Sequence, residues 1–196
     1  MKEVAIIDVG VGNIHSLERA VFKSGYIPSV ITDANAVNLN QLDGLILPGV
    51  GHAKAFLSAV EGGDMAELLL NFAKTERPLV GICLGMQVLG GELDEADGQC
   101  GLGILPFDVR MNTQAGLSCS HTCWESIDFL GVEGRAYFNH RYSCIARDQS
   151  GIEALSTLGN SRAVAYVKQG NVYGLQFHPE KSQKTGLAII RKIIGE

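Results

Sequence analysis

Short apolar runs alternate with segments of helical periodicity through the first half of the chain. Val4–Val9 is apolar except for Asp8, which is typical of a strand that is buried on both faces of a parallel sheet. A helix is predicted next, between residues 13 and 25, because the apolar positions there recur at helical spacing. Asn13 is its expected N-cap, and Gly25 is the residue at which it is expected to stop.

The same order of strand, glycine-containing loop and helix then repeats. The pattern predicts further strands over Pro28–Thr32, Gly44–Leu47 and Leu79–Ile82, and helices over Ala53–Val60 and Met65–Ala73. Repeated strand–helix units predict an α/β fold with a parallel, doubly wound sheet. The loops at residues 10–13, 48–51 and 83–85 all follow the carboxyl ends of strands, which is the edge where such sheets bind ligands.

The pattern changes in the second half of the chain. From Phe107 to Val172, short strand-like segments and turns predominate, and we interpret them as antiparallel additions to the sheet. No linker-like composition separates the two halves, so residues 1–196 are predicted to form one domain. A last strand over Val172–His178 meets Pro179, and an apolar-faced helix over Thr185–Ile194 follows.

Composition and charge indicate which classes of partner the protein can bind and in which cellular compartment it is expected. The net charge is −5 and no basic run is present, so neither nucleic acid nor an anionic membrane is expected as a partner. The longest apolar stretches are far shorter than the roughly 20 residues that span a bilayer. The N-terminal apolar run is too short for a signal peptide. Five cysteines without framework spacing indicate free thiols, and a cytoplasmic protein is expected.

No cofactor is expected. The glycine loop after the first strand matches a dinucleotide-binding fingerprint only in part. Its third glycine is missing, because His15 stands at that position. The sequence therefore argues against a bound dinucleotide.

The main candidate for chemistry is Cys83, which lies between an apolar run and a helix-like run. Gly81 and Gly85 flank it at two residues on either side, which is the pattern of a nucleophile elbow at a strand-to-helix turn. The partial positive charge of a helix N-terminus favours the thiolate, the reactive form of the side chain. The alternative interpretation is an inert cysteine buried on a glycine-rich turn.

A cysteine nucleophile needs a base, and His178 is the best placed of five histidines. It lies at the end of a predicted strand, and in extended backbone residues 178 and 180 project on the same side. Glu180 could then orient the imidazole, as the acid of a catalytic triad does. The alternative is a surface histidine next to a solvated glutamate.

Together these motifs resemble the class I (triad) glutamine amidotransferases. The two motifs that carry this resemblance are Gly81-Ile82-Cys83-Leu84-Gly85-Met86-Gln87 and Gln176-Phe177-His178-Pro179-Glu180. Further stretches are similar to the glutaminase subunits of imidazole glycerol phosphate synthase: Asp8–Asn13, Pro48–Gly51, Gly101–Gly103, Tyr137-Phe138-x-His140 and His178–Ser182. The resemblance runs in order through almost the whole chain and implies a three-layer, flavodoxin-like fold with a mostly parallel central sheet.

The resemblance implies hydrolysis of glutamine to glutamate and ammonia through a Cys-His-Glu triad. Cys83 would attack the side-chain amide, His178 would move the proton to the departing ammonia, and Glu180 would orient His178. Backbone N–H groups of Leu84 and of Val50 or Gly51 would hold the oxyanion. The residues expected to bind the substrate glutamine are Gly49, Gln87, Arg141 and Tyr142.

The resemblance also implies a partner, a separate (β/α)₈ cyclase subunit in a heterodimer. Ammonia would pass through a tunnel to that subunit, which makes imidazole glycerol phosphate and aminoimidazole carboxamide ribotide in histidine biosynthesis. Glutaminase activity would stay low until the partner binds its own substrate. The Pro48–Gly51 loop is the expected switch, because its two glycines make a peptide flip easy. The residues expected to face the partner are Gly12, Asn13, His121, Trp124, Lys181 and Ser182.

This chain departs from the usual pattern of those subunits in two segments. Ser120-His121-Thr122-Cys123-Trp124-Glu125 stands where Pro-His-Met-Gly-Trp-Asn is usual, and Arg141 follows His140 in place of a small hydroxyl residue. Arg141 and Glu125 could pair with each other or with a partner. The departures leave open a paralogue that supplies ammonia to a different synthase, for example in sugar amination. A cysteine hydrolase of the wider flavodoxin-like group is the other alternative.

No metal site is expected. Cys119-x-His121-x-Cys123 places zinc-ligand types at alternate positions, which share one face of a strand. A structural zinc site needs a fourth ligand, and the other cysteines nearby, Cys100 and Cys144, lack motif spacing.

Overall fold

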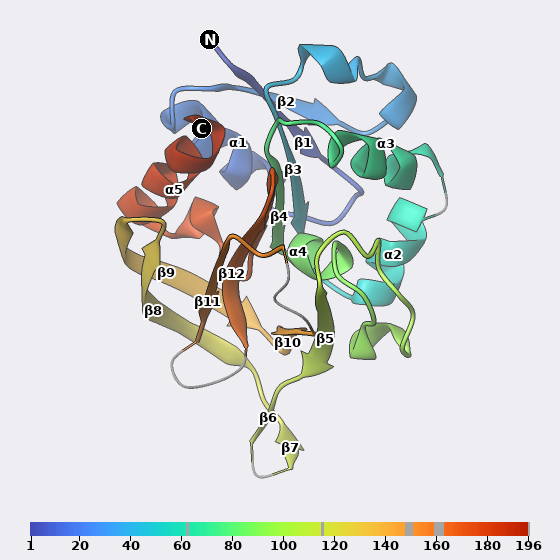
Figure 1. Ribbon diagram of the computed structural model, residues 1–196, viewed down its shortest axis with the longest axis vertical. Helices are drawn as coiled ribbons and strands as arrows, with labels where there is room; N and C mark the ends of the chain where they lie inside the picture. Colours follow the sequence, from blue (N-terminus) through green and yellow to red (C-terminus); the bar gives the residue numbers. More distant parts are fainter. Residues whose placement is uncertain (62, 115, 148–150, 159–162, 196) are drawn as a thin grey trace.

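A seven-stranded, mostly parallel sheet forms the centre of the molecule (Figure 1). The computed structural model describes residues 1–61, 63–114, 116–147, 151–158 and 163–195. In spatial order, the strands are β11 (Ala154–Thr157), β12 (Val164–Gln169), β13 (Val172–Leu175), β4 (Leu79–Cys83), β3 (Gly44–Gly49), β1 (Glu3–Ile7) and β2 (Ile27–Ile31). The last five of these strands pair in parallel, whereas β11 and β12 pair antiparallel. The predicted α/β fold with antiparallel additions is thereby confirmed.

Helices cover both faces of this sheet and make three layers. One face carries α1 (Ile14–Lys23) and α5 (Gln183–Gly195), and the other carries α2 (Ala53–Glu61), α3 (Asp64–Phe72) and the short α4 (Leu84–Val88) (Figure 1). Side chains of β1 alternate between the two faces. Val4 and Ile6 pack with the α1 and α5 side, and Ala5 and Ile7 pack with the α2 and α3 side. This is why the first strand reads as a continuous apolar run.

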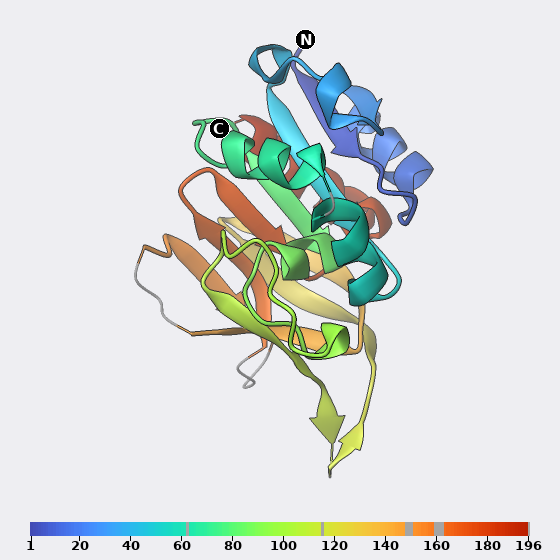
Figure 2. The same ribbon diagram turned by 90° about the vertical axis from the view of Figure 1, so that its right-hand side faces the viewer.

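The C-terminal half adds small antiparallel pairs to this framework. They are β5 (Phe107–Met111) with β10 (Tyr142–Ala146), β6 (Thr113–Gln114) with β7 (Leu117–Ser118), and β8 (His121–Phe129) with β9 (Val132–His140). The β6–β7 pair extends away from the body of the molecule (Figure 2). The β8–β9 hairpin turns at Leu130 and Gly131, both with positive φ, as a two-residue hairpin turn requires.

Short 3₁₀ turns complete the elements. They are η1 (Ala34–Ala36), η2 (Leu39–Gln41), η3 (Asp94–Ala96) and η4 (Pro179–Lys181).

The structure moves some predicted boundaries. The first strand ends at Ile7, and α1 begins after Asn13, whose side chain makes no capping hydrogen bond. Gly25 has a φ of 95° and follows the end of α1, as predicted. The last strand is shorter than predicted, because β13 ends at Leu175 and the chain then turns to bridge β9 at Phe177.

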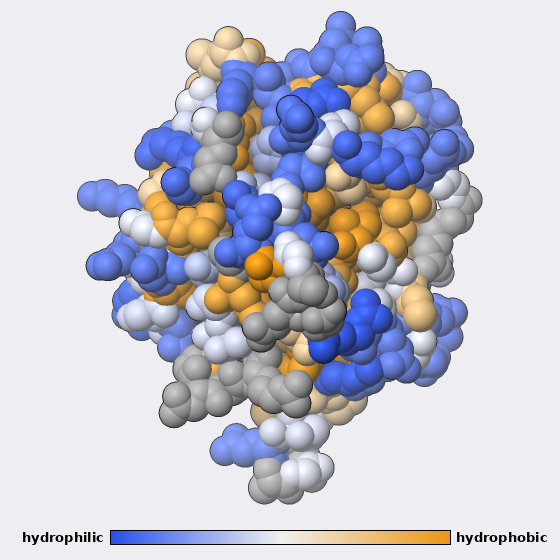
Figure 3. Space-filling view, viewed as in Figure 1, coloured by the Kyte–Doolittle hydropathy of each residue, from blue (hydrophilic) through white to orange (hydrophobic). Residues whose placement is uncertain are grey.

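The surface mixes polar and apolar groups. On the face that Figure 3 shows, hydrophobic side chains lie in patches between hydrophilic ones. Among the large apolar residues in the described helices and strands, Phe22 on α1 is the most exposed, at 69%. Within the described part of the chain, no helix has the length and the apolar character that crossing a membrane requires.

Candidate active site

Cys83 occupies a strained turn between β4 and α4. Its φ of 53° and ψ of −109° are unusual for a residue with a β-carbon, and such a conformation persists only where the surroundings enforce it. The two flanking glycines allow the turn. A Cβ on Gly85 would lie 1.9 Å from the carbonyl oxygen of Leu47, and one on Gly81 would lie 2.7 Å from Cα of Met86. The predicted elbow is therefore present. Both flanking positions require glycine, because a Cβ at either one would clash with neighbouring atoms.

The end of β3 lies directly against this elbow. A Cβ on Gly49 would lie 2.7 Å from the backbone N of Gly85, so Gly49 lets the two segments touch. Val50 and Gly51 follow at the mouth of the pocket, and Gly51 has a φ of 101°. Leu84 begins α4, where the first backbone N–H groups of a helix have no intrahelical acceptor. The residues predicted to donate backbone N–H groups to an oxyanion thus line the same pocket as Cys83.

His178 is held by backbone bonds to the β8–β9 hairpin. Its N–H donates to the carbonyl of Tyr137 at 2.9 Å. The hydroxyl of Ser182 donates to the carbonyl of His178 at 2.6 Å and accepts from the N–H of Tyr137 at 3.0 Å. Ser182 is only 1% exposed. The expectation that Ser182 faces a partner is therefore wrong, because this side chain is used inside the molecule to fix the turn.

Glu180 reaches His178 by a route that differs from the predicted one. The backbone after His178 is not extended: it forms η4, with Pro179 at the first position of the turn. The carboxylate Oε1 of Glu180 nevertheless lies 2.9 Å from Nδ1 of His178. Both side chains are at least 95% buried. The pairing was predictable from the spacing, but the alternation of a strand was the wrong reason for it.

The environment of His178 favours its protonated form. Burial alone lowers the pKa of His178, but side-chain hydrogen bonds with Cys83 and Glu180, and their negative charges, raise it to about 10. The imidazole is therefore protonated at neutral pH. A protonated imidazole beside the sulfur is the acid that a departing amine needs.

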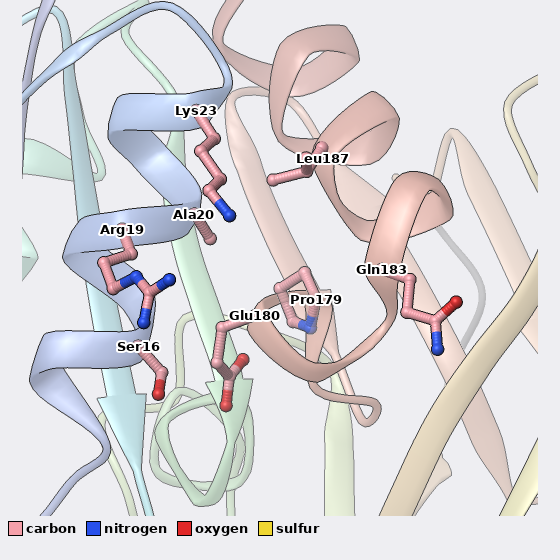
Figure 4. Close-up of a pocket in the computed structure, with 8 residues that line it drawn as sticks. All are labelled: Ser16, Arg19, Ala20, Lys23, Pro179, Glu180, Gln183 and Leu187. Carbon is pink, nitrogen blue, oxygen red and sulfur yellow. The ribbon is translucent and has the colours of Figure 1, made fainter.

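The second oxygen of Glu180 does not take part in the bond to His178. This Oε2 is buried and has no hydrogen-bond partner within the described part of the chain. The carboxylate borders a pocket between α1 and η4, into which the side chains of Ser16 and Arg19 also point (Figure 4). Arg19 and Lys23 place positive charge on the wall of this pocket, opposite in sign to the carboxylate.

A pocket opens over Cys83 and collects most of the predicted site residues. It is lined by Val50, Gly51, Cys83, Leu84, Gln87, Glu95, Ser120, Asn139, His140, Arg141, Tyr142, His178 and Lys181. Gly49 is buried beneath the loop and does not line it. Glu95 was not predicted. Its carboxylate accepts from the N–H of Ala53 at 2.9 Å, which fixes it to the start of α2. No local pattern indicates this role, since Glu95 stands among other acids in a polar loop.

Gln176 is a second residue that sequence reasoning left without a role. It is fully buried, its Nε2 donates to Sγ of Cys83 at 3.8 Å, and its Oε1 accepts from Nε2 of Gln87 at 3.3 Å. Gln87 also donates to the carbonyl of Tyr142 at 3.0 Å. An amide in an otherwise apolar strand end was the available signal, because a buried polar side chain needs partners.

The residues expected to face a partner fall in three places. Trp124 and Lys181 gather around Tyr137, with ring centroids of Trp124 and Tyr137 5.6 Å apart and Nζ of Lys181 5.6 Å from the Tyr137 ring. Gly12 lies beside Pro48 at the start of α1, with Asn13 next to it. His121 lies on β8, three residues from Trp124 and therefore on the opposite face of the hairpin.

The two unexplained charges of the sequence do not meet. The carboxylate of Glu125 is 3.4 Å from Sγ of Cys123, whereas Arg141 lines the pocket over Cys83. Among the described residues, no ion pair joins Arg141 to Glu125. Each of the two charges therefore needs an explanation of its own.

Comparison with known proteins agrees with this geometry. The sequence pattern of the family "Glutamine amidotransferase class-I" matches residues 5–194. The chain is 36% identical to the imidazole glycerol phosphate synthase subunit HisH of Syntrophotalea carbinolica, over 96% of this chain and 97% of that protein. It is 34% identical to the subunit of the same name from Escherichia coli K12, over 97% and 98%. A crystal structure of a glutamine amidotransferase shares the fold, with a TM-score of 0.78 and 22% identity over 98% of this chain and 99% of that one.

Proposed function

The chain belongs to the class I glutamine amidotransferases, and from this premise we propose that it is the glutaminase subunit of an imidazole glycerol phosphate synthase. It hydrolyses glutamine to glutamate and ammonia. The observation that carries the proposal is the buried arrangement of Cys83, His178 and Glu180, of which Cys83 and His178 line a pocket. The relatives with the HisH name match over nearly their full length, which supports the assignment of the synthase.

In the first half of the reaction, the thiolate of Cys83 attacks the side-chain carbonyl carbon of glutamine. The carbonyl oxygen becomes an oxyanion, which the N–H groups of Leu84 and of Val50 or Gly51 stabilise. His178 then gives its proton to the departing nitrogen. The carbon–nitrogen bond breaks, ammonia leaves, and a glutamyl thioester remains on the sulfur.

In the second half, water replaces the sulfur. His178 is now neutral and takes a proton from water as the hydroxide adds to the thioester carbonyl. The carbon–sulfur bond breaks, and glutamate leaves. Glu180 stays ionised throughout, holding Nδ1–H of the imidazole and stabilising its positive charge, which is the role of the acid in such triads.

The charges around the pocket suit a zwitterionic amino acid. Glu95 offers a carboxylate to an α-ammonium group, and Arg141 offers a guanidinium to an α-carboxylate. Gln87 and Tyr142 line the same pocket and are joined by a hydrogen bond from the Gln87 amide to the Tyr142 carbonyl. We expect these four residues to orient glutamine so that its amide reaches Cys83.

The ammonia is used by a second subunit. By the resemblance, this is a cyclase with a (β/α)₈ barrel, bound as a heterodimer. The cluster of Trp124, Tyr137 and Lys181 is a candidate contact surface, since aromatic side chains are enriched at interfaces. The Pro48–Gly51 loop touches the elbow and is the candidate switch by which the partner controls the oxyanion donors.

A glutaminase assay with and without the partner tests the proposal. Glutamate production is measured for the wild type, Cys83→Ala and His178→Ala, alone and mixed with the cyclase of the same organism and its ribonucleotide substrate. Stimulation of the wild type and loss of turnover in both variants are expected, while Cys100→Ala, at an exposed cysteine, keeps wild-type activity. Turnover by Cys83→Ala would contradict the assignment of the nucleophile. Glutaminase activity without stimulation or complex formation would point to a different synthase.

A further inference from the structure

Three side chains of zinc-ligand type come together on one face of β8. His121, Cys123 and Glu125 stand at alternate positions of the strand, so their side chains project on the same side. The Nε2 of His121 is 3.0 Å from Sγ of Cys123, which is 3.4 Å from Oε1 of Glu125. The third distance, from His121 Nε2 to Glu125 Oε1, is 3.9 Å. One atom could therefore touch all three groups.

These distances fit the geometry of a tetrahedral zinc ion. Zinc lies about 2.3 Å from a thiolate sulfur and about 2.0–2.2 Å from an imidazole nitrogen or a carboxylate oxygen, so neighbouring ligand atoms stand roughly 3.4–3.6 Å apart. The distance of 3.4 Å falls at the edge of this range, and those of 3.0 and 3.9 Å lie below and above it by less than about half an ångström. Small rotations of exposed side chains would close the difference.

The surroundings of the three groups allow an ion to enter. The side chains of His121 and Glu125 are 30% and 47% exposed, so solvent reaches the cluster. Cys119, which the sequence pattern brought into consideration, is not part of it. Its place is taken by Glu125, and a carboxylate is also an ordinary zinc ligand.

A buried imidazole beside the cluster is a second, independent observation that points to a ligand. His140 pairs with His121 in the hairpin register, and their ring centroids are 5.1 Å apart. His140 is 94% buried, and its Nδ1 lies 2.8 Å from the carbonyl of Tyr142, to which it must donate. Its Nε2 is then an acceptor, and among the residues that the structure describes it has no hydrogen-bond partner. A water molecule on an ion next to His121 would be a donor close to this nitrogen.

We propose that the β8–β9 hairpin binds one Zn²⁺-type divalent cation through Nε2 of His121, Sγ of Cys123 and the carboxylate of Glu125, with a water in the fourth position. Cys123 and Glu125 are two of the positions at which this chain departs from the usual pattern of the glutaminase subunits. The site explains why both are present. It also revises the expectation of no metal, which considered cysteines as further ligands and not Glu125.

The ion would act on the strand that supports the active site. The carbonyl of Tyr137 on β9 accepts from the N–H of His178, and the carbonyl oxygen of Asn139 lies 3.9 Å from Sγ of Cys83. Both carbonyls belong to the strand that pairs with β8. An ion that links three positions of β8 would therefore stabilise the hairpin on which both groups rest.

Metal titration of the whole chain tests the site. Chelator-treated protein is titrated with Zn²⁺ in competition with a chromophoric indicator, and with Co²⁺ to record the charge-transfer band of a cobalt–thiolate bond. One ion per chain and a cobalt–thiolate band are expected. His121→Ala, Cys123→Ser and Glu125→Gln should each weaken Zn²⁺ binding at least about tenfold, and Cys123→Ser should abolish the cobalt band. Cys119→Ser is the matched control and should bind as the wild type does.

A second variant separates this site from the catalytic pair, which also contains a thiol and an imidazole. Cys83→Ala should keep one Zn²⁺ per chain and the cobalt band. The melting temperature should rise with Zn²⁺ in the wild type and in Cys83→Ala but not in Cys123→Ser, because only a folded site binds the ion. The proposal would be overturned if the wild type bound no stoichiometric Zn²⁺. It would also be overturned if Cys83→Ala removed the binding and Cys123→Ser did not.

Discussion

Replacing Glu180 by Gln removes one charge from the centre of the proposed mechanism while keeping the shape of the side chain. In the structure, the carboxylate lies 2.9 Å from Nδ1 of His178, and both side chains are almost fully buried. The amide that replaces the carboxylate can still present an oxygen to Nδ1–H, but it no longer stabilises the imidazolium by charge. The variant therefore isolates the electrostatic part of the interaction.

The size of the effect follows from the kind of bond that is lost. A hydrogen bond to a charged group contributes about 1.5–3 kcal/mol, and about 1.4 kcal/mol corresponds to a factor of ten in rate. Glu180→Gln should therefore lower kcat/KM roughly 10- to 150-fold. If the amide instead turned its NH₂ group to Nδ1, it would select the wrong tautomer, and the loss would approach about 10⁴-fold, as in other triads.

The pH dependence gives an independent readout of the same change. In the wild type the pKa of His178 is raised to about 10, with Glu180 as one of the causes, so activity that needs the protonated imidazole extends to alkaline pH. Loss of the Glu180 charge lowers this pKa. The alkaline limb of the kcat/KM profile should then move to lower pH in Glu180→Gln.

The assay is glutamate release at saturating and limiting glutamine across the pH range, with the partner and its substrate present. Glu133→Gln is the control, because it makes the same change at an exposed position of β9. Two results would refute the role given to Glu180. One is a kcat/KM of Glu180→Gln equal to that of the wild type; the other is a lower rate with no shift in the alkaline limb of the pH profile.

Three further outcomes follow from the structure. Gly85→Ala should prevent folding or strongly lower the melting temperature, because its Cβ would lie 1.9 Å from a backbone oxygen of β3, whereas Gly63→Ala, in open space and extended backbone, should melt near the wild type. Gln176→Ala should lower kcat more than it raises KM, since Gln176 contacts Cys83 but does not line the pocket. A variant with the kcat and KM of the wild type would contradict this. Protonated His178 stabilises the fold fully below its unfolded pKa of 6.5, and this stabilisation is lost as the pH rises through about 10. The urea midpoint of the wild type should therefore fall more steeply between these two pH values than that of His178→Ala.

The elements of the first half could be predicted because local pattern and tertiary environment agree there. Each strand of the parallel part is buried on both faces, so apolar runs mark them, and glycine loops mark their carboxyl ends. The elbow was predictable for the same reason, since Gly81, Cys83 and Gly85 lie within five residues of one another. Two expectations failed near the C-terminus: β13 stops at Leu175 and not at His178, and a turn at Pro179 replaces the extended backbone expected between His178 and Glu180.

The parts that the sequence did not reveal depend on contacts between distant segments. Gln176 meets Cys83 across 93 positions of the chain, and Cys83 meets the carbonyl of Asn139 across 56. Neither contact leaves a local pattern. The register of β8 against β9 likewise decides that His121 stands opposite His140, and it is fixed by the turn at Leu130 and Gly131 rather than by the two histidines.

The support that the hairpin gives to the active site passes through backbone atoms, and this explains why side-chain patterns miss it. Tyr137 and Asn139 contact His178 and Cys83 with their carbonyl oxygens, so these contacts do not depend on the type of side chain at either position. Substituting either side chain should then disturb the catalytic pair less than shifting the strand that carries both. A change on β8 that moves β9 would act on His178 and Cys83 together. The hairpin is accordingly the element through which a ligand or partner outside the pocket can reach both groups at once.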